Sequence, residues 1–459
     1  MRDPVPLQEG ATHPLTDLLP LDQTAEDREA LRAATALLGS QMRVELGLRQ
    51  DALAIEETTS GPVLRTRGVA GTITLGRLTF DIRPKHVPDP TDTAWQHALT
   101  VMLDRAGRRR VRFTRTRRLT FRPRTFIDQL AMGLALELDE ATRHAEVRAY
   151  HSQRAELSAV RGRILVSEQL RSALLKPHKV VCEVDELSSD NPINNLLHWA
   201  VIQLAALVTQ PRVRHELSVQ AARLPSMTQP IRPPAQLVFH LPRQYQHYAG
   251  AIELATAFAR GLTTVHGTSN IGGAGFLVGT ERLFESFVER SLEVALADGD
   301  TWTVDAQKRS EYATPVDTTT SDRSFFSTPD NIARRYDGVG LIVDAKYKRF
   351  QDETDETIPD RPSNGDIYQM AAACVAHQCS RALLVYPRMS KQEPVGDWVP
   401  RWWRIDVGAK SLLVGAVTVP LQLLTESDGV LLFDQRLRRL VEAAVLANEV
   451  GGESLEVAS

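Results

Sequence analysis

The sequence predicts an α/β domain at the C-terminal end of the chain, preceded by an α+β region that contains a small β-rich module and helices. In residues 63–83, apolar and polar side chains alternate around Gly71 and Gly76, which is typical of two or three short antiparallel strands. Residues 340–343 form an apolar run after a turn-like Tyr-Asp-Gly, which indicates a buried strand. Helical patterns precede and follow this run, and the resulting order of elements is an α/β arrangement.

Length and composition limit the kinds of protein that this chain can be. The 459 residues have room for two or three domains of roughly 100 to 200 residues each. With 42% hydrophobic and 24% charged residues, the chain has the composition of an ordinary globular protein. No run approaches the roughly 18 apolar residues that span a bilayer, and the first residues lack the apolar stretch of a signal peptide, so we expect a cytoplasmic protein without membrane contact. Three cysteines without CxxC spacing or clustered histidines predict neither a disulfide framework nor structural zinc.

The first expected domain, residues 1–95, is a β-rich module with a lead-in helix. An extended segment over residues 1–25 leads to a helix over residues 25–46, where leucine and alanine recur at helical spacing. The alternating residues 63–83 then provide the strands, which end in the basic corner Arg83-Pro84-Lys85.

Residues 105–124 contain ten arginines and no acidic residue. Such a segment can neutralise the phosphates of a nucleic acid or dock on an acidic partner protein. An exposed strand pair with solvated arginines is the alternative. Because like charges repel unless an anion compensates them, we expect contact with DNA or a partner. The residues assigned to this contact are Arg108, Arg109, Arg110, Arg112, Arg115, Arg117 and Arg118.

The second expected domain, residues 96–262, is mainly helical, includes the arginine-rich segment and is assigned to partner docking. Around residue 190, the sequence predicts a helix start in which Asp190 or Asn191 caps the first turn and Pro192 fits it. A stretch rich in Gly, Ser, Thr and Asn over residues 261–275 marks the next domain boundary. The other helices are expected over residues 94–104, 126–146, up to about 174, and 248–262.

The third expected domain, residues 263–459, holds the α/β pattern. It begins with an amphipathic helix over residues 280–296. Residues 315–327 are typical of a polar loop before the apolar run. Further elements are expected as a strand and turn over residues 301–312, a helix from residue 365, strands over residues 382–386, 402–407 and 412–417, and a helix over residues 434–448.

Asp344 and Lys346 close the apolar run of residues 340–343, and Pro329-Asp330 precedes it. Because alternate side chains of a strand share a face, Asp344 and Lys346 point the same way. If Asp330 lies on the neighbouring strand, two carboxylates and an ammonium group meet at one strand end. Mg²⁺ prefers oxygen ligands and a nearby lysine can orient or deprotonate water, so this group suits metal-assisted phosphodiester cleavage. The same pattern also occurs on strands without any site.

Several ordered motifs together resemble McrC, the nuclease subunit of modification-dependent McrBC restriction systems, and the C-terminal half is similar to PD-(D/E)xK nucleases. The resemblance extends over about residues 63–388. In the C-terminal half it rests on Phe276-Leu277, residues 283–288, Pro329-Asp330, and residues 344–348, 366–370 and 383–387. In the N-terminal half it rests on residues 71–82, Arg83-Pro84-Lys85, and residues 161–164 and 190–194.

The resemblance implies that Asp330 and Asp344 bind Mg²⁺ and that Lys346 positions or activates the attacking water. It also implies that Glu285 supplies an auxiliary acid and metal ligand, and that Gln369 supports the site from the following helix. From the residues alone, Glu285 fits a solvated helix face equally well, and Gln369 fits a hydrogen bond within its own helix.

The resemblance further implies a DNA endonuclease of an antiviral restriction system that acts with a McrB-like AAA+ GTPase, or ATPase, ring. Such proteins insert their N-terminal region into the ring and stimulate its hydrolysis. No phosphate-binding GxxxxGK[ST] loop occurs in this sequence, so the motor activity belongs to another polypeptide. Lys348 is either a DNA phosphate contact or an exposed strand lysine, and the arginine-rich segment either contacts the ring or grips DNA. A non-cleaving DNA-binding adaptor of the motor and a stand-alone repair nuclease are the alternative functions.

Overall fold

A computed structural model of the chain separates into two compact units. The larger unit combines Arg2–Arg110 with Thr263–Ser459, and the smaller unit is Val111–Leu262. Three domains were expected from the sequence. Whether those three parts fold independently is a separate question from this division, so the three-domain arrangement stays a prediction. The structure describes residues 4–18, 25–75, 78–87, 94–106, 125–172, 176, 178–234, 239, 241–265, 273–297, 301–314, 324–336, 338, 340–348, 361–389, 398–407, 410–426 and 428–446.

Two sheets form the N-terminal part of the larger unit, with strand orders β1-β6-β5-β11-β10 and β2-β4-β3. The segment expected as an extended lead-in contains two strands, and the first of them pairs in parallel with β6. This pairing joins residues more than seventy positions apart, so it leaves no local pattern in the sequence. The elements are β1 (Val5–Gln8), β2 (Thr12–Pro14), α1 (Leu15–Leu18), α2 (Ala25–Glu45), β3 (Leu53–Thr58), β4 (Gly61–Thr66), β5 (Val69–Leu75), β6 (Leu78–Arg83), α3 (Ala94–Ala106), β10 (Leu262–Val265) and β11 (Gly273–Gly279).

The alternating residues of β5 and β6 supply a hydrophobic core shared with α2. Ile73, Phe80 and Ile82 are fully buried in one cluster with Leu38 and Met42 of α2, which is the burial that the period-two and helical patterns predict. Leu277 of β11 belongs to the same cluster. The core therefore joins the two sequence segments of the larger unit.

β5 and β11 pair closely at Gly71, which lies opposite Leu277. The φ angle of Gly71 is +129°, and a Cβ atom there would lie 2.2 Å from the carbonyl oxygen of Phe276. Only glycine fits this position without a shift of the backbone.

A six-stranded mixed sheet with the order β12-β15-β16-β17-β19-β18 forms the C-terminal part of the larger unit. β16 pairs antiparallel with β15 and parallel with β17. The central strand β16 is buried along its whole length, as its apolar sequence predicts. The elements are α9 (Thr280–Ala295), β12 (Trp302–Ala306), β13 (Ser310–Ala313), β14 (Phe325–Ser327), β15 (Asn331–Arg335), β16 (Gly340–Ala345), α10 (Asn364–His377), β17 (Arg381–Arg388), β18 (Arg401–Val407), β19 (Lys410–Pro420), a 3₁₀ turn (Leu421–Thr425) and α11 (Gly429–Leu446).

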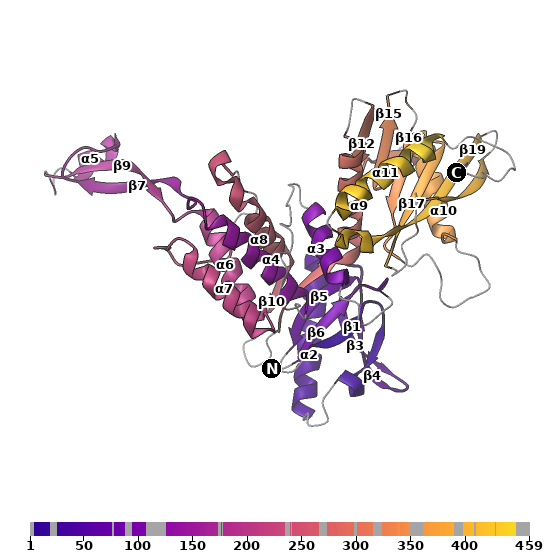
Figure 1. Ribbon diagram of the computed structural model, residues 1–459, viewed down its shortest axis with the longest axis horizontal. Helices are drawn as coiled ribbons and strands as arrows, with labels where there is room; N and C mark the ends of the chain where they lie inside the picture. The colour runs from indigo at the N-terminus through magenta and orange to yellow at the C-terminus, as the bar shows by residue number, and fades with distance from the viewer. Residues whose placement is uncertain are drawn as a thin grey trace. The chain divides into compact units, whose positions relative to one another are not determined.

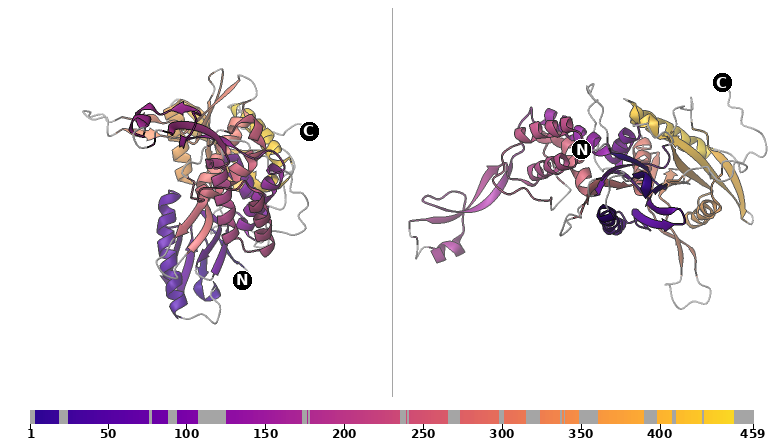
Figure 2. Two further views of the ribbon diagram at one scale, coloured as in Figure 1. Left: turned by 90° about the vertical axis from the view of Figure 1, so that its left-hand side faces the viewer. Right: turned by 90° about the horizontal axis from the view of Figure 1, so that it is seen from below.

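Helices cover both faces of this sheet (Figure 1; Figure 2). On one face, Ile332, Ile342 and Leu384 pack with Met370 and Cys374 of α10. α9 and α11 contact β16 as well, and they lie on the opposite face, toward which the alternate residues of the strand point. The carboxyl end of β16 therefore lies between helices that come from both sides.

The smaller unit contains a group of helices and a three-stranded sheet in the order β7-β9-β8. In Figure 1 this sheet, with α5, extends away from the helices as an arm. Its strands were not expected, because β7 exposes both faces and so shows no apolar alternation. The elements are α4 (Phe126–Ala141), β7 (Ala149–Leu157), β8 (Arg163–Ile164), α5 (Val166–Ser172), β9 (Val180–Ser188), α6 (Pro192–Leu207), α7 (Pro211–Arg223), a 3₁₀ helix (Arg243–Tyr248) and α8 (Ala249–Gly261).

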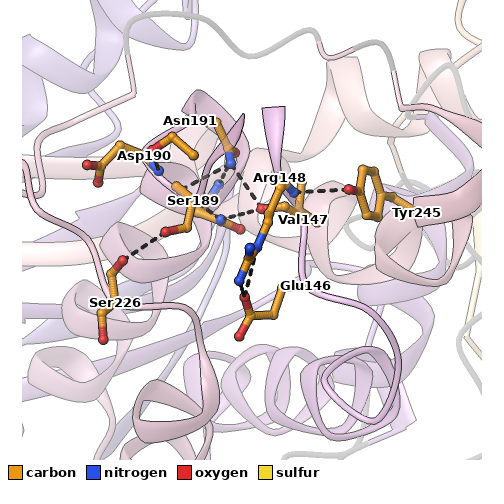
Figure 3. Close-up of polar contacts among 10 residues, drawn as sticks. Glu146, Val147, Arg148, Ser189, Asp190, Asn191, Ser226 and Tyr245 are labelled. Atoms are coloured by element: carbon orange, nitrogen blue, oxygen red, sulfur yellow. Dashed lines mark hydrogen bonds and ion pairs between the residues drawn. The ribbon is translucent and has the colours of Figure 1, made fainter. Parts of the chain in front are cut away.

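The base of the arm is fixed by the segment that the sequence identifies as a helix start (Figure 3). Asn191 is the N-cap of α6, accepting a hydrogen bond from the backbone N–H of Asn194, and Pro192 follows it. The side-chain amides of Asn191 and Asn194 both donate to the carbonyl oxygens of Val147 and Ser189. Val147 and Ser189 flank β7 and β9, so one pair of amides holds both strands of the arm to α6.

Two other segments differ from the prediction. Phe325–Ser327, expected within a polar loop, is strand β14 and pairs with β13. Helix α4 ends at Ala141, five residues before the predicted end. Among the helices of the described residues, none is long and apolar enough to cross a lipid bilayer.

Candidate functional site

Asp330 and Asp344 lie opposite each other at one end of the β15–β16 pair. Asn331 is in register with Val343 and Ile332 with Ile342, so the next position in this register joins Asp330 and Asp344. Oδ2 of Asp330 accepts a hydrogen bond of 2.9 Å from the backbone N–H of Ala345. The two aspartates thus face each other across adjacent strands, which is the arrangement that the hypothesis of a shared ion requires.

Gln307, which sequence reasoning missed, holds Asp330 from the other side. Its backbone N–H donates to the carbonyl oxygen of Asp330 at 2.9 Å, and its side-chain amide donates to Oδ1 at 3.2 Å. The φ angle of Gln307 is +48°, a left-handed conformation that costs energy for a residue with a side chain. The sequence carries no signal for this role, because the two residues come together only through the pairing of β12 with β15.

Lys346 connects Asp344 to α10. Its Nζ lies 2.6 Å from Oδ2 of Asp344 and donates a hydrogen bond of 2.9 Å to Oε1 of Gln369. The side chain of Asp344 is 1% exposed and that of Lys346 is 19% exposed, so the pair is largely shielded from water. The structure therefore brings together four of the predicted site residues, Asp330, Asp344, Lys346 and Gln369.

Glu285 lies on α9 and is electrostatically part of the same group. Burial raises its pKa to about 7, and the negative charges of Asp330, Glu281 and Asp344 add to this effect against the positive charge of Lys346. Glu285 is half-buried, between the solvated helix face and the apolar stripe of α9, so its role in the site stays a prediction. Because the charges of both aspartates act on Glu285, its pKa depends on whether Asp330 and Asp344 are ionised.

The carboxylates also affect one another and the lysine. Burial and the charge of Asp344 raise the pKa of Asp330 to about 6, against the hydrogen bond from Ala345 and the charge of Lys346. Burial of Lys346 lowers its pKa, but the aspartates, above all Asp344, outweigh this effect and the net pKa is raised. Lys346 is therefore a positive charge between negative groups.

The residues present fit a divalent cation that keeps part of its water shell. Among the described residues, no group of three or more His, Cys, Asp or Glu side chains is arranged to hold a metal ion. Two facing carboxylates, of which Asp330 has a raised pKa, still form a site at which added positive charge would be stabilised. Mg²⁺ is commonly held by one or two carboxylates and completes its shell with water and substrate phosphate. The donor set fits that mode of binding.

Lys348 is tied to α10. Its Nζ lies 2.6 Å from Oδ2 of Asp366, and Tyr386 donates a hydrogen bond of 3.2 Å to the same oxygen. Asp366, a second residue that sequence reasoning missed as a partner, therefore neutralises the predicted phosphate contact. The Lys348 side chain remains 42% exposed, so contact with phosphate stays a prediction.

The arginine-rich segment is described only in part. Arg105, at its start, forms an ion pair of 2.6 Å with Asp434 of α11. Residues 107–124 lie outside the described residues, so the contacts assigned to Arg108, Arg109, Arg110, Arg112, Arg115, Arg117 and Arg118 stay predictions.

Comparison with known proteins places these features in a family. The model of the family described as McrBC 5-methylcytosine restriction system component matches residues 64–387. The fold is similar to a chain in the tetradecameric assembly of Thermococcus gammatolerans McrB AAA+ hexamers with bound McrC. In that comparison the sequence identity is 20%, the TM-score is 0.63, and the match covers 96% of this chain and 99% of that chain.

A second solved structure, the cryo-EM structure of the Thermococcus gammatolerans McrBC complex, matches at 20% identity with a TM-score of 0.43, covering 65% of this chain and 89% of that chain. Comparison with curated proteins gives no match. At 20% identity the first structure supports the fold alone, whereas the family model spans well over half of the sequence and confirms the resemblance drawn from the motifs. The chain therefore belongs to the family of McrBC 5-methylcytosine restriction system components.

Proposed function

We propose that this chain is the McrC-type, Mg²⁺-dependent endonuclease subunit of a restriction system, with a PD-(D/E)xK nuclease domain in its C-terminal part. The observation that carries the proposal is the group of Asp330, Asp344 and Lys346 at one end of β15 and β16, with Gln369 bonded to the lysine. The family membership supports it independently.

Each residue has a role that follows from its contacts. Asp330 and Asp344 would hold Mg²⁺, which when bound supplies Lewis-acid activation of water and of the scissile phosphate. Lys346, oriented by Asp344 and Gln369, donates to the attacking water or to a phosphate oxygen. Glu285, whose pKa is about 7, can exchange a proton near neutral pH. The chemistry is hydrolysis of a phosphodiester bond of DNA.

A cleavage assay tests this proposal. We expect the chain, assembled with its AAA+ partner, to cut DNA with Mg²⁺ and to lose cleavage when the metal is chelated or when Asp344 is changed to Asn. A matched control is Asp406→Asn, because Asp406 is an exposed residue on β18 of the same sheet that accepts a hydrogen bond from Ser411. Unchanged cleavage by Asp344→Asn would contradict the proposal. Stimulated nucleotide hydrolysis without any cleavage by the unmodified complex would favour the adaptor function.

The partner is proposed to be a McrB-like AAA+ ring, since McrB hexamers accompany McrC in the assembly of similar fold. The arm of the smaller unit is the candidate docking element. It exposes the apolar side chains of Val160, Val166 and Leu170, and exposed apolar groups on a projecting element are typical of a protein interface. Arg161 and Arg163 lie among them, are well exposed, and pair with Glu186 and Glu183 of β9 at 3.5 and 3.9 Å. Such exposed pairs are weak, so acidic groups on the partner can replace them.

A further inference from the structure

Glu9, directly after β1, is a buried carboxylate to which three other segments bond. Glu9 is only 3% exposed. The hydroxyl of Thr280 donates to Oε1 at 2.6 Å, the hydroxyl of Tyr347 to Oε2 at 2.9 Å, and the backbone N–H of Lys85 to Oε2 at 3.1 Å. All three donors belong to the larger unit.

Two of these donors adjoin residues of the nuclease centre. Thr280 is the first residue of α9, the helix that carries Glu285. Tyr347 directly follows Lys346 and lies beyond the end of β16. The third donor, Lys85, belongs to the Arg83-Pro84-Lys85 corner, whose basic character the proposed reaction does not use.

The Tyr347 ring is enclosed by the same corner. Nζ of Lys85 lies 4.7 Å from the ring centroid, and the His86 ring packs edge-on with a centroid distance of 5.2 Å. Phe284 of α9 lies against the ring at 6.1 Å. Tyr347 is 6% exposed, so its position is fixed by the N-terminal module on one side and by α9 on the other.

We propose that Glu9 is a positioning residue for the nuclease centre, which holds the backbone after Lys346 and the first turn of α9 in a fixed relation. The inference rests on the proposed nuclease function. β16 ends at Ala345, and the backbone N–H of Lys346 still bonds the carbonyl oxygen of Val385 at 2.8 Å. Beyond that bond, the hydrogen bond from the Tyr347 hydroxyl to Glu9 fixes the position of the backbone. A shift there moves the Lys346 ammonium away from Asp344 and Gln369.

A carboxylate suits this position. Both oxygens of Glu9 accept hydrogen bonds, and the three groups that bond to them act as donors. In a Glu9→Gln variant the volume is kept, but the Thr280 hydroxyl must turn round to accept from the new NH₂ group, and the hydrogen bonds from Tyr347 and Lys85 lose the assistance of a negative charge. A displacement of about 1 Å at a reacting group can lower a rate about a hundredfold. We therefore expect an effect on turnover rather than on DNA binding.

The experiment compares Glu9→Gln and Tyr347→Phe with Asp128→Asn in the assembled complex. Asp128 is a matched control because it is also buried, accepts hydrogen bonds from Thr125, Thr209 and Gln210, and lies in the unit without nuclease residues. We expect Glu9→Gln to lower kcat for Mg²⁺-dependent cleavage by about ten- to a hundredfold, with KM for DNA and the partner's nucleotide hydrolysis unchanged. Tyr347→Phe should also lower kcat, and the double variant should lose less than the product of the two single effects, because both changes affect the hydrogen bond between Glu9 and Tyr347.

Two results overturn the inference. One is a kcat of Glu9→Gln within about twofold of the unmodified complex, where loss of positioning predicts far more. The other is an equal loss of kcat in Asp128→Asn at an equal loss of melting temperature, which assigns the effect to general destabilisation. Absence of cleavage by the unmodified complex instead rejects the nuclease function itself, so the two failures are distinguishable.

Discussion

Replacing Lys346 by Met tests the proposed site most directly, because it removes one charge from a largely buried cluster. The Lys346–Asp344 distance of 2.6 Å corresponds to an attraction of about 6 kcal/mol at an effective dielectric constant of about 20. Desolvation offsets part of it, and leaving a buried partner uncompensated usually costs about 3–5 kcal/mol of unfolding free energy. For a unit of this size that is a melting temperature lower by roughly 5–8 °C.

Mg²⁺ should reduce this loss. A cation held by Asp330 and Asp344 compensates the carboxylate that Lys346 leaves unpaired, and any ligand that binds only the folded state stabilises it. We expect the melting temperature of Lys346→Met to recover in part with millimolar Mg²⁺, while single-turnover DNA cleavage stays about 10²- to 10⁴-fold below the unmodified complex. The comparison is Lys348→Met: its lysine is 42% exposed and its partner Asp366 is 8% exposed, but Asp366 keeps the hydrogen bond from Tyr386, so we expect a smaller loss of melting temperature that Mg²⁺ does not restore.

A clear result would refute the assignment. If Lys346→Met loses the same melting temperature with and without Mg²⁺, the two aspartates do not hold the ion. If its cleavage rate stays within about threefold of the unmodified complex, far from the loss expected for a proton-transferring or charge-stabilising group, Lys346 has no role in the reaction.

Three further predictions concern titration, docking and the arm. Because the pKa of Glu285 is raised to about 7, its ionisation destabilises the fold as pH rises from about 4.5 through about 7. Glu285→Gln should therefore raise the metal-free melting temperature at pH 8 and not at pH 4, in calorimetric scans. Leu170→Asp on the arm should abolish stimulation of the partner's nucleotide hydrolysis at unchanged melting temperature, whereas Leu431→Asp, equally apolar and exposed on α11, should not. Asn191→Ala should lower the stability of the smaller unit by about 1–3 kcal/mol, measured by denaturant unfolding, and weaken the same stimulation.

The sequence predicts those parts of the site that depend only on residues close together in the chain. Asp344 and Lys346 share a face because strands alternate, and the apolar run between residues 340 and 343 identifies its own strand. Gln369 and Glu285 were assigned only by resemblance, since a helix does not reveal which strand end it approaches. The structure shows Gln369 bonded to Lys346 and Glu285 within reach of both aspartate charges.

The rest depends on contacts between distant segments. Glu9 and Tyr347 are 338 positions apart, and nothing in the sequence near either residue indicates a bond between them. The same holds for β1, a four-residue strand ordered by pairing with β6. β7 was missed for a different reason: both of its faces are exposed, so the burial that produces alternation is absent.

Chain connectivity joins the N-terminal module to the proposed nuclease centre independently of Glu9. β11 pairs with β5 over seven positions, and α9 begins at the residue directly after it. Glu285 is thus six residues from a strand of the N-terminal sheet. Phe276 and Leu277 of β11 are fully buried, so a fragment that begins at residue 263 would expose them and leave one edge of β11 without its partner. The proposed nuclease centre and the N-terminal module therefore belong to one compact unit, and α9 connects the module's strand β11 to the proposed site.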